Sequence, residues 1–294
     1  MKRIVTIQDI SCLGKCSLTV ALPVISAMGV EAAIVPTAVL STHTMFKNFT
    51  FHDLTDQIAP IGEHWQKENF DFDAIYTGYL GSFEQIQLVT EFFERFKTEK
   101  NQIIVDPAMG DSGNLYTGFN EDFAKEMAKL CGKADLILPN LTEACFMTGI
   151  PYRGGKNAGY GANRDDSQGE APDRAYYQEV LLALAELGAK KVVLTGASTE
   201  PGKTGFMGYD TETRQYFSYS HSMQPTSYHG TGDIFSSTTV GALMRGYSLE
   251  EALTIAADFT SACIRITIQN GKAPWYGVDF EQAIPMLIQR LGSL

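Results

Sequence analysis

Basic residues are scarce in this chain. Its 294 residues include 23 Lys and Arg against 34 Asp and Glu, which gives a formal net charge of −11 at pH 7. A protein that binds nucleic acid needs a basic patch or stripe, so this balance argues against a nucleic-acid partner. The same shortage of positive charge gives the chain no attraction to an anionic membrane surface.

Paired cysteines and long apolar runs are also missing. The five cysteines are an odd number and form no CxxC pair, which predicts reduced thiols in a cytoplasmic protein. Residues 17–30 resemble the apolar core of a signal peptide. However, the 16 residues before them include Asp9, and no clear cleavage site follows, so we expect no secretion signal. No apolar run is long enough to span a bilayer.

Short apolar runs alternate with longer helical segments along the chain. The expected strands are 3–8, 32–40, 73–77, 102–106, 136–139 and 191–195. The expected helices are 15–28, 54–67, 84–97, 121–131, 141–148, 174–187, 231–245, 249–269 and 280–291. This alternation predicts right-handed βαβ units around a parallel sheet. Several expected strands are almost continuously apolar, as in sheets that are covered on both faces.

Three local features refine this outline. Residues 205–210 and 215–220, joined by the four residues 211–214, predict an antiparallel hairpin at one edge of the sheet. Pro23 inside the first expected helix predicts either a kink or a late helix start. No repeat and no domain boundary is visible, so we expect a single domain over residues 1–294.

The segment Gly230-Thr231-Gly232-Asp233 has the pattern of an anion site. Its two glycines let backbone N–H groups turn toward one point, and the helix that follows adds its positive end. Asp233 falls within the first helical turn, where a carboxylate can take a proton from an attacking hydroxyl group. Alternatively, Asp233 is only a first-turn acid that the helix dipole favours.

Polar residues also follow the other expected strands. Ligands of an open parallel sheet bind beyond the carboxyl ends of its strands. The positions in question are Asp9 and 12–15, 41–44, 77–82, 106–111, 140–143 and 195–196. Any one of them has a simpler explanation; Asn140, for example, could cap a helix with Glu143 at its third position. Capping alone does not explain the whole series.

Several of these segments match motifs of one enzyme family. They are STHT at 41–44, TGYLGS at 77–82, DPAMGD at 106–111, PNLTE at 139–143, LTG at 194–196 and GTGD at 230–233. With these motifs in this order, the chain resembles a ribokinase-superfamily kinase and, within it, the pyridoxal kinase group. The resemblance implies a three-layer ribokinase-like α/β fold, in which helices flank a twisted, mostly parallel sheet, and a homodimer.

The resemblance also implies an activity. The reaction would be ATP-dependent phosphorylation of the 5′-hydroxymethyl group of a vitamin B6 vitamer (pyridoxal, pyridoxamine or pyridoxine) in pyridoxal phosphate salvage. Asp233 would be the base, and the glycine turn from Gly230 through Thr231 and Gly232 would hold the charge that develops on the phosphoryl group.

On the nucleotide side, the resemblance implies roles for six further residues. Asp106 and Glu143 would be the ligands of Mg²⁺, partly through water, and Asn140 would help to organise the metal and the triphosphate. Asp111 and Thr195 would lie near the phosphates, with Gly196 beside the nucleotide. The sequence does not decide whether a monovalent cation also takes part.

On the substrate side, Thr44 and Tyr79 match positions that contact or flank the pyridine ring, with His43 beside them. His43 could equally be an ordinary loop residue. Asp9 departs from the family, which commonly has serine at this position. Its carboxylate would either favour a protonated ring nitrogen or an amine, or pair with Lys15 and never touch the substrate.

Residues 153–172 are a second departure, with five glycines and few apolar side chains. A connection of this length is unusual. It is either an insertion without consequence or a flap over the nucleotide, in which Lys156 and Arg164 would approach the phosphates.

Two other functions remain open at this point. The first is a hydroxymethylpyrimidine kinase of thiamine synthesis, which shares the fold, the base and a flat substrate. The second is a catalytically silent relative that binds pyridoxal phosphate. The complete set of base, anion site and metal-binding residues argues against a silent protein, which need not keep all three together.

Overall fold

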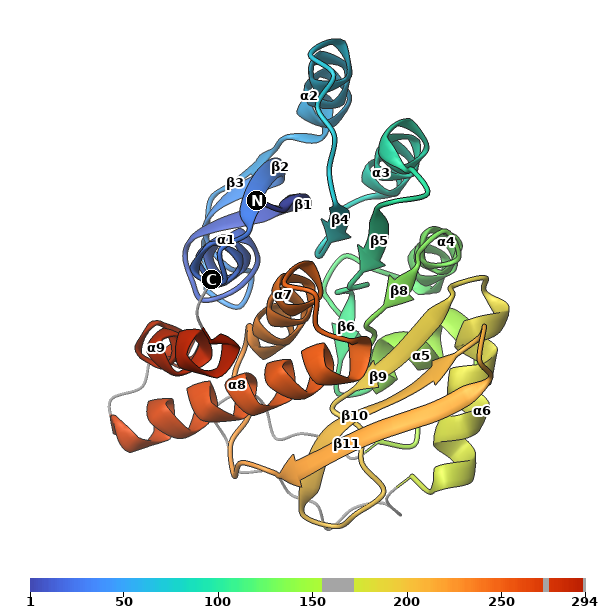
Figure 1. Cartoon of the computed structure of the whole chain (residues 1–294), viewed down its shortest axis with the longest axis vertical. Coiled ribbons are helices and arrows are strands. Elements are labelled where there is room, and N and C mark those ends of the chain that lie inside the picture. The colour runs from blue at the N-terminus through green and yellow to red at the C-terminus, as the bar shows by residue number, and fades with distance from the viewer. Residues whose placement is uncertain (155–171, 272–274, 293–294) are drawn as a thin grey trace.

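A nine-stranded sheet forms the centre of the molecule, with helices on both of its faces (Figure 1). The computed structural model describes residues 1–154, 172–271 and 275–292. The strand order is β11-β10-β9-β8-β5-β4-β1-β2-β3. The strands are β1 (Arg3–Leu13), β2 (Glu31–Thr42), β3 (Phe51–Asp53), β4 (Ala74–Thr77), β5 (Gln102–Val105), β8 (Leu136–Ile137), β9 (Lys191–Thr195), β10 (Lys203–Asp210) and β11 (Gln215–Ser222).

The strands between β9 and β2 run parallel, and antiparallel strands extend the sheet at both edges. At one edge, β10 pairs with β9 and with β11, which confirms the predicted hairpin. At the other edge, β3 pairs with β2. A separate small hairpin joins β6 (Gly110–Asp111) to β7 (Asn114–Leu115). The structure confirms the predicted mostly parallel sheet.

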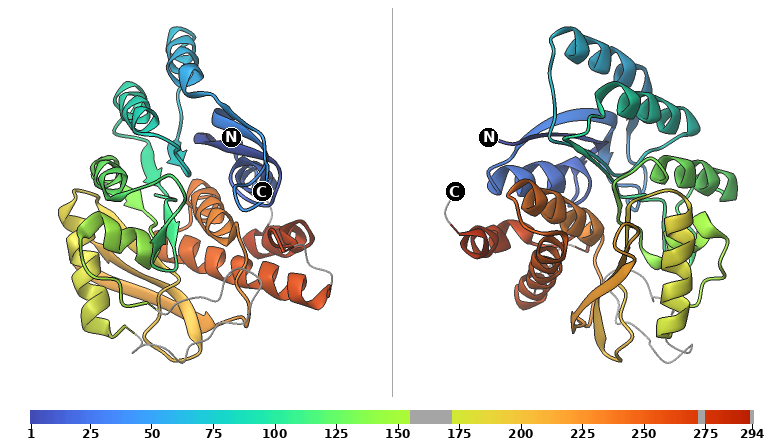
Figure 2. Two further views of the ribbon diagram at one scale, coloured as in Figure 1. Left: turned by 180° about the vertical axis from the view of Figure 1, so that it is seen from behind. Right: turned by 45° about the vertical axis from the view of Figure 1, so that its right-hand side comes forward.

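The helices form the two outer layers (Figures 1 and 2). One face of the sheet is covered by α2 (Thr55–Lys67), α3 (Phe83–Phe96), α4 (Glu121–Cys131), α5 (Leu141–Thr148) and α6 (Arg174–Glu186). The other face is covered by α1 (Leu18–Ala27), α7 (Thr231–Met244), α8 (Leu249–Gln269) and α9 (Phe280–Leu291). Within β4, Ile75 joins the core under the first layer, whereas Tyr76 joins the core under the second. Successive side chains of a strand point to opposite faces, so both cores are built from the same strands.

The structure corrects several predicted boundaries. The first helix begins at Leu18 instead of residue 15, but Pro23 still lies inside it, so the later start does not account for the proline. β1 continues to Leu13, well past the predicted end at residue 8, because it keeps pairing with β2 beyond a register shift between Gln8 and Ile10. Asp9 therefore lies inside the strand. The short strands β3, β6 and β7 were not predicted. Residues 155–171 of the predicted insertion lie outside the described residues.

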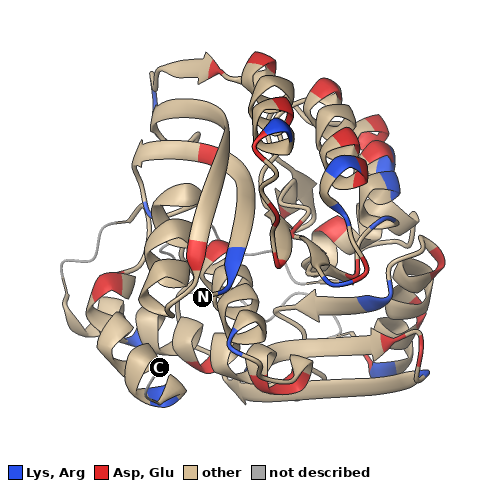
Figure 3. Ribbon diagram, turned by 45° about the horizontal axis from the view of Figure 1, so that its top comes forward, with Lys and Arg blue, Asp and Glu red and all other residues tan. Residues whose placement is uncertain are grey.

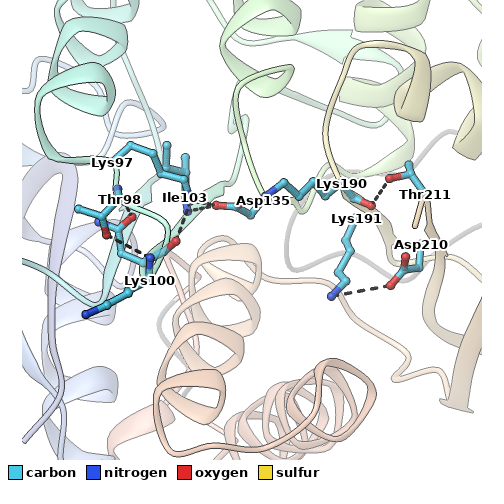
Figure 4. A network of polar contacts seen from close by, with 10 residues as sticks. Lys97, Thr98, Lys100, Ile103, Asp135, Lys190, Lys191, Asp210 and Thr211 are labelled. Atoms are coloured by element: carbon cyan, nitrogen blue, oxygen red, sulfur yellow. Dashed lines mark hydrogen bonds and ion pairs between the residues drawn. The ribbon is translucent and has the colours of Figure 1, made fainter. Parts of the chain in front are cut away.

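A polar network holds together the amino ends of three central strands (Figure 4). Asp135, just before β8, accepts hydrogen bonds from the ammonium groups of Lys97 and Lys190. It also accepts one from the backbone N–H of Ile103 in β5, at 2.8 Å. Lys190 precedes β9, so this single carboxylate links the starts of β5, β8 and β9.

Basic and acidic residues are interspersed along several helices and strands of the ribbon in Figure 3. The five cysteines are free thiols, of which Cys12 is exposed and the other four are buried. Over the described ranges, none of the helices has the length and apolar character needed to cross a membrane.

Candidate active site

A cavity of about 260 Å³ lies where β5, β8 and β9 end and α7 begins. All of the residues predicted for catalysis and for binding of nucleotide or metal line this cavity. They are Asp106, Asp111, Asn140, Glu143, Thr195, Gly196, Gly230, Thr231, Gly232 and Asp233. Loops at three strand ends and one helix terminus therefore bring residues that are far apart in the sequence to a single place.

The first turn of α7 supplies the anion-binding geometry. Gly230 is the N-cap and has a φ of 80°, which a glycine adopts without steric cost. A Cβ atom at this position would also overlap the carbonyl oxygen of Lys15, so the turn packs directly against the chain before α1. The N–H groups of Thr231, Gly232 and Asp233 lie in the first turn of α7, where a backbone N–H has no carbonyl partner within the helix. Such groups attract an anion.

The carboxyl group of Asp233 has the electrostatics of a base for use near neutral pH. Burial and then the charge of Asp106 raise the pKa of Asp233 to about 8. Burial also raises the pKa of Asp106 to about 6. Ser236, one helical turn after Asp233, donates a hydrogen bond of 2.6 Å to Asp106. A carboxylate with a pKa near 8 binds a proton more strongly than an ordinary aspartate, which favours proton abstraction.

Asn140 and Glu143 form the capping box that opens α5. The side chain of Asn140 accepts a hydrogen bond from the backbone N–H of Glu143 at 3.0 Å and donates one to the carbonyl of Gly110 at 2.8 Å. The carboxylate of Glu143 accepts hydrogen bonds from the N–H groups of Asn140 at 2.8 Å and Met109 at 3.1 Å. The capping interpretation of this pair is thus confirmed. A metal that Glu143 helps to bind would share its oxygens with these amides, which suits contact through water.

The carboxyl groups of Asp106, Asp111 and Glu143 line the cavity, and a Mg²⁺ ion there would be held largely through water and phosphate oxygens. Burial, followed by the charge of Asp106, raises the pKa of Glu143, and Asp111 adds to this rise. A cation among these carboxylates would relieve their mutual repulsion. Within residues 1–154, 172–271 and 275–292, no group of three or more His, Cys, Asp or Glu side chains is arranged to hold a metal ion.

Thr195 and Gly196 form the floor of the cavity beside α5. Thr195 forms an isolated parallel bridge with Asn140, which joins the end of β9 to the start of that helix. Its hydroxyl lies 3.4 Å from the carbonyl of Pro139. Gly196 has a φ of 68° and nothing within 4 Å of the place where a Cβ would be, so space is left for a ligand.

The four predicted substrate-side residues are not among the described residues that line this cavity. Asp9 is buried within β1 and accepts hydrogen bonds from the hydroxyls of Ser11 at 3.2 Å and Ser17 at 2.5 Å. Lys15 instead forms ion pairs with Asp279 at 3.0 Å and Glu281 at 2.9 Å. The alternative in which Lys15 neutralises Asp9 is therefore wrong.

His43 connects separate loops next to the anion-binding turn. Its Nδ1 accepts a hydrogen bond from the N–H of Met45, so Nε2 carries the hydrogen and donates it to the carbonyl of Tyr276 at 3.1 Å. Its ring lies 4.4 Å from that of His229, the residue before Gly230. Burial lowers the pKa of His43, and burial followed by the charge of His43 lowers the pKa of His229 to about 3. Both imidazoles are neutral at physiological pH.

Tyr79 and Thr44 occupy different environments. The ring of Tyr79 lies 5.5 Å from that of Phe119. Burial and then the charge of Asp9 raise the pKa of Tyr79 to about 12. Thr44 is exposed at the start of the loop after β2. Both positions remain predicted ring contacts.

Sequence reasoning missed three residues of this region. Ser236 could have been found, because a hydroxyl three positions after Asp233 lies on the same side of the helix. His229 and Ser17 carried no such signal. Their contacts depend on how the chain before α1 and the loop before α7 meet in space.

The chain is similar throughout its length to known kinases. The family model for phosphomethylpyrimidine kinase matches residues 20–276. A crystal structure from Bacteroides thetaiotaomicron, described as a phosphomethylpyrimidine kinase in a form with pyridoxal, is 37% identical. Its TM-score is 0.85, with 97% of this chain and 95% of that chain covered. Pyridoxal kinase from Lactobacillus plantarum is 30% identical, with a TM-score of 0.85 and coverage of 99% and 98%.

More distant relatives include both pyridoxal kinases and a hydroxymethylpyrimidine/phosphomethylpyrimidine kinase. Pyridoxal kinase of Leishmania donovani, in complex with ADP and pyridoxamine, shares the fold at 21% identity, with a TM-score of 0.82 and coverage of 98% and 96%. Pyridoxal kinase of Dictyostelium discoideum is 25% identical, with coverage of 85% and 79%. Hydroxymethylpyrimidine/phosphomethylpyrimidine kinase of Haemophilus influenzae is also 25% identical, with coverage of 93% and 96%. The chain belongs to the phosphomethylpyrimidine kinase family of the ribokinase superfamily, and it is a kinase.

Proposed function

We propose that this kinase transfers the γ-phosphoryl group of ATP to the 5′-hydroxymethyl group of a vitamin B6 vitamer. The observation that carries the proposal is the position of Asp233 in the first turn of α7, in the same cavity as Asn140 and Glu143. The choice of a B6 vitamer is supported by two relatives. The B. thetaiotaomicron structure, although described as a phosphomethylpyrimidine kinase, is in a form with pyridoxal, and the L. plantarum protein is a pyridoxal kinase.

In this proposal the hydroxyl oxygen of the substrate attacks the γ-phosphorus of ATP, and Asp233 accepts the proton of that hydroxyl. The N–H groups of Thr231, Gly232 and Asp233 face the charge that develops on the transferred group. Donors that are already oriented need no rearrangement when this charge develops, which lowers the activation barrier. The reaction leaves ADP and the 5′-phosphate ester.

Asp106, Asn140 and Glu143 would hold the metal and the triphosphate. Mg²⁺, when bound, neutralises charge on the phosphates and helps to orient them. Asp111 and Thr195 are proposed to lie near the phosphates, and Gly196 to leave room beside the nucleotide. The structure of the L. donovani relative with ADP supports the use of ATP.

The pyridine ring is proposed to lie between Thr44 and Tyr79, with His43 beside it. Both ring nitrogens of His43 are engaged by backbone groups. His43 would therefore offer the substrate its ring surface and no further hydrogen bond. We also expect the enzyme to be a homodimer, which sedimentation equilibrium can test.

Phosphorylation of hydroxymethylpyrimidine is the second candidate function. It is favoured by the family match itself and by the H. influenzae relative, which aligns over nearly its whole length. Both substrates are flat heteroaromatic rings with a hydroxymethyl group, so the same base and anion site serve either one. The difference must lie in the contacts with the ring.

A panel of substrates separates these candidates. ADP release would be followed in a coupled assay with Mg²⁺-ATP and, in turn, pyridoxal, pyridoxamine, pyridoxine and hydroxymethylpyrimidine. We expect the highest kcat/KM with a B6 vitamer. A preference for hydroxymethylpyrimidine would support the second candidate. If no substrate caused ADP to be formed but the protein bound pyridoxal phosphate, a silent relative would be supported.

A further inference from the structure

Ser17 has a backbone conformation that serine rarely adopts. It is the N-cap of α1, with φ 49° and ψ −136°. A serine at this position usually caps the helix with its hydroxyl, but Ser17 makes no such bond. Strained residues of this kind persist only where the surrounding structure holds them, and they concentrate at functional sites. The contacts that hold Ser17 in this conformation therefore point to a function.

Ser17 connects Asp9 to the turn beside Asp233. Its hydroxyl, which does not cap the helix, donates a 2.5 Å hydrogen bond to Oδ1 of Asp9. Its backbone N–H is close enough to the carboxyl group of Asp233 to favour the charged form, and so it lowers the pKa of that group. Ser17 therefore lies between the middle of β1 and the proposed base.

The turn that contains Ser17 is fixed against the anion-binding turn. The carbonyl of Lys15 occupies the place where Gly230 would carry a side chain. The ammonium group of Lys15 is held by Asp279 and Glu281. Gly14 lies against the ring of His43, where a Cβ would come within 3.2 Å. Small movements of residues 14–17 would therefore be passed directly to the first turn of α7.

We propose that Asp9 and Ser17 are positioning residues for Asp233: Asp9 holds the Ser17 hydroxyl, and the turn of residues 15–17, which packs against Gly230, then sets the first turn of α7 that carries the base. This inference rests on the proposed role of Asp233. It gives Asp9 a function other than reading the charge of the substrate. A carboxylate suits the role because its two oxygens accept hydrogen bonds from Ser11 and Ser17.

Four variants test this arrangement, with kcat and KM measured separately for pyridoxal and ATP. Asp9→Ala and Ser17→Gly each remove the link between positions 9 and 17, and glycine tolerates the positive φ. We expect kcat to fall by about 10- to 100-fold, the usual effect of a misplaced catalytic group, with KM values within about twofold of the parent. Asp9→Asn keeps an acceptor for Ser17 and should restore most of the rate. Ser11→Ala is the matched control, since it removes the other partner of Asp9 and should leave kcat near the parent value.

A second set of variants asks whether the effect passes through Asp233. Once Asp233→Asn has removed the base, adding Asp9→Ala or Ser17→Gly should lower kcat no further. A full additional loss in the double variants would overturn the inference. So would an Asp9→Ala variant that changes only the preference among pyridoxal, pyridoxamine and pyridoxine. Asp233→Asn with parental turnover is a different result, because it would remove the proposed base itself. Thermal unfolding identifies variants that fold; if Asp9→Ala does not, Ser17→Gly and Asp9→Asn carry the test.

Discussion

Asp233 is the residue on which the proposed chemistry depends. Replacing it by asparagine keeps the shape of the side chain but removes its ability to accept a proton. We predict that Asp233→Asn lowers kcat by ~10²–10⁴-fold, the usual contribution of a positioned general base, with little change in ATP affinity. Steady-state kinetics and a nucleotide-binding titration measure the two quantities. Turnover close to that of the parent would show that Asp233 has only a structural role.

The raised pKa of Asp233 predicts a pH dependence. With a pKa of about 8, the group is mostly protonated at neutral pH and becomes a competent base as the pH rises. The kcat/KM for the vitamer should therefore increase with pH and level off above about 8, since this ratio reports ionisation of the free enzyme. Asp233→Asn should lose this rise. A parental profile that is flat between pH 6 and 9 would contradict the assignment.

Among individual residues, the sequence predicted the site residues that lie at the ends of strands. It missed the residues that tertiary packing brings to the site. Asp106, Asn140 and Thr195 could be brought together in advance, because parallel strands end at one edge of a sheet. The partners of Asp9 could not, since they depend on the positive φ of Ser17 and on the chain folding back against Gly230.

The glycine at the N-cap of α7 determines where this helix starts and how closely its first turn packs against Lys15. Gly230→Ala adds a side chain both to a positive φ and to the space held by Lys15. We predict a loss of stability and a sharp fall in kcat. Gly246→Ala, just beyond the other end of the helix, is the matched control: its φ is 89°, but nothing lies within 4 Å of a new Cβ. That variant should lose only about 1–2 kcal/mol of unfolding free energy, the cost of a left-handed backbone conformation for a residue with a side chain. Equal effects of both changes on Tm and kcat would argue against close packing at Gly230.

The start of α5 allows structural and metal-binding roles to be separated. Glu143→Gln keeps one acceptor and loses the other, so one of the two backbone amides loses its partner. We predict a destabilisation of about 1 kcal/mol and a higher Mg²⁺ concentration for half-maximal rate, because a neutral amide supports the water shell of the ion poorly. Urea unfolding and a Mg²⁺ titration measure the two effects. An unchanged Mg²⁺ dependence with reduced stability would leave Glu143 with the capping role alone.

Element boundaries show where sequence patterns fail. Residues 15–17 have helix-compatible side chains, so the pattern extended the first helix through them. In the structure they form the turn against Gly230, and α1 starts only at Leu18. The two-residue strands β6 and β7 are too short for any periodicity to reveal them.

Across the whole molecule, the alternation of strands and helices was sufficient to predict the layered sheet. Each central strand is covered on both faces, and its apolar sequence reflects that burial. The position of the site followed from the topology. The choice of substrate did not, because the proposed ring contacts come from loops whose shape depends on the assembled fold. One of these loops carries His43, which bonds to the carbonyl of Tyr276.

Direct competition between the two candidate substrates tests the central claim. Pyridoxal and hydroxymethylpyrimidine would be mixed at equal concentration with limiting Mg²⁺-ATP, and both phosphorylated products quantified by mass spectrometry. The ratio of initial product rates equals the ratio of kcat/KM values, so differences in enzyme quality cancel. We predict pyridoxal 5′-phosphate in at least about 10-fold excess, which corresponds to roughly 1.4 kcal/mol of differential transition-state binding. An excess of the phosphorylated pyrimidine would contradict the assignment of this kinase to vitamin B6.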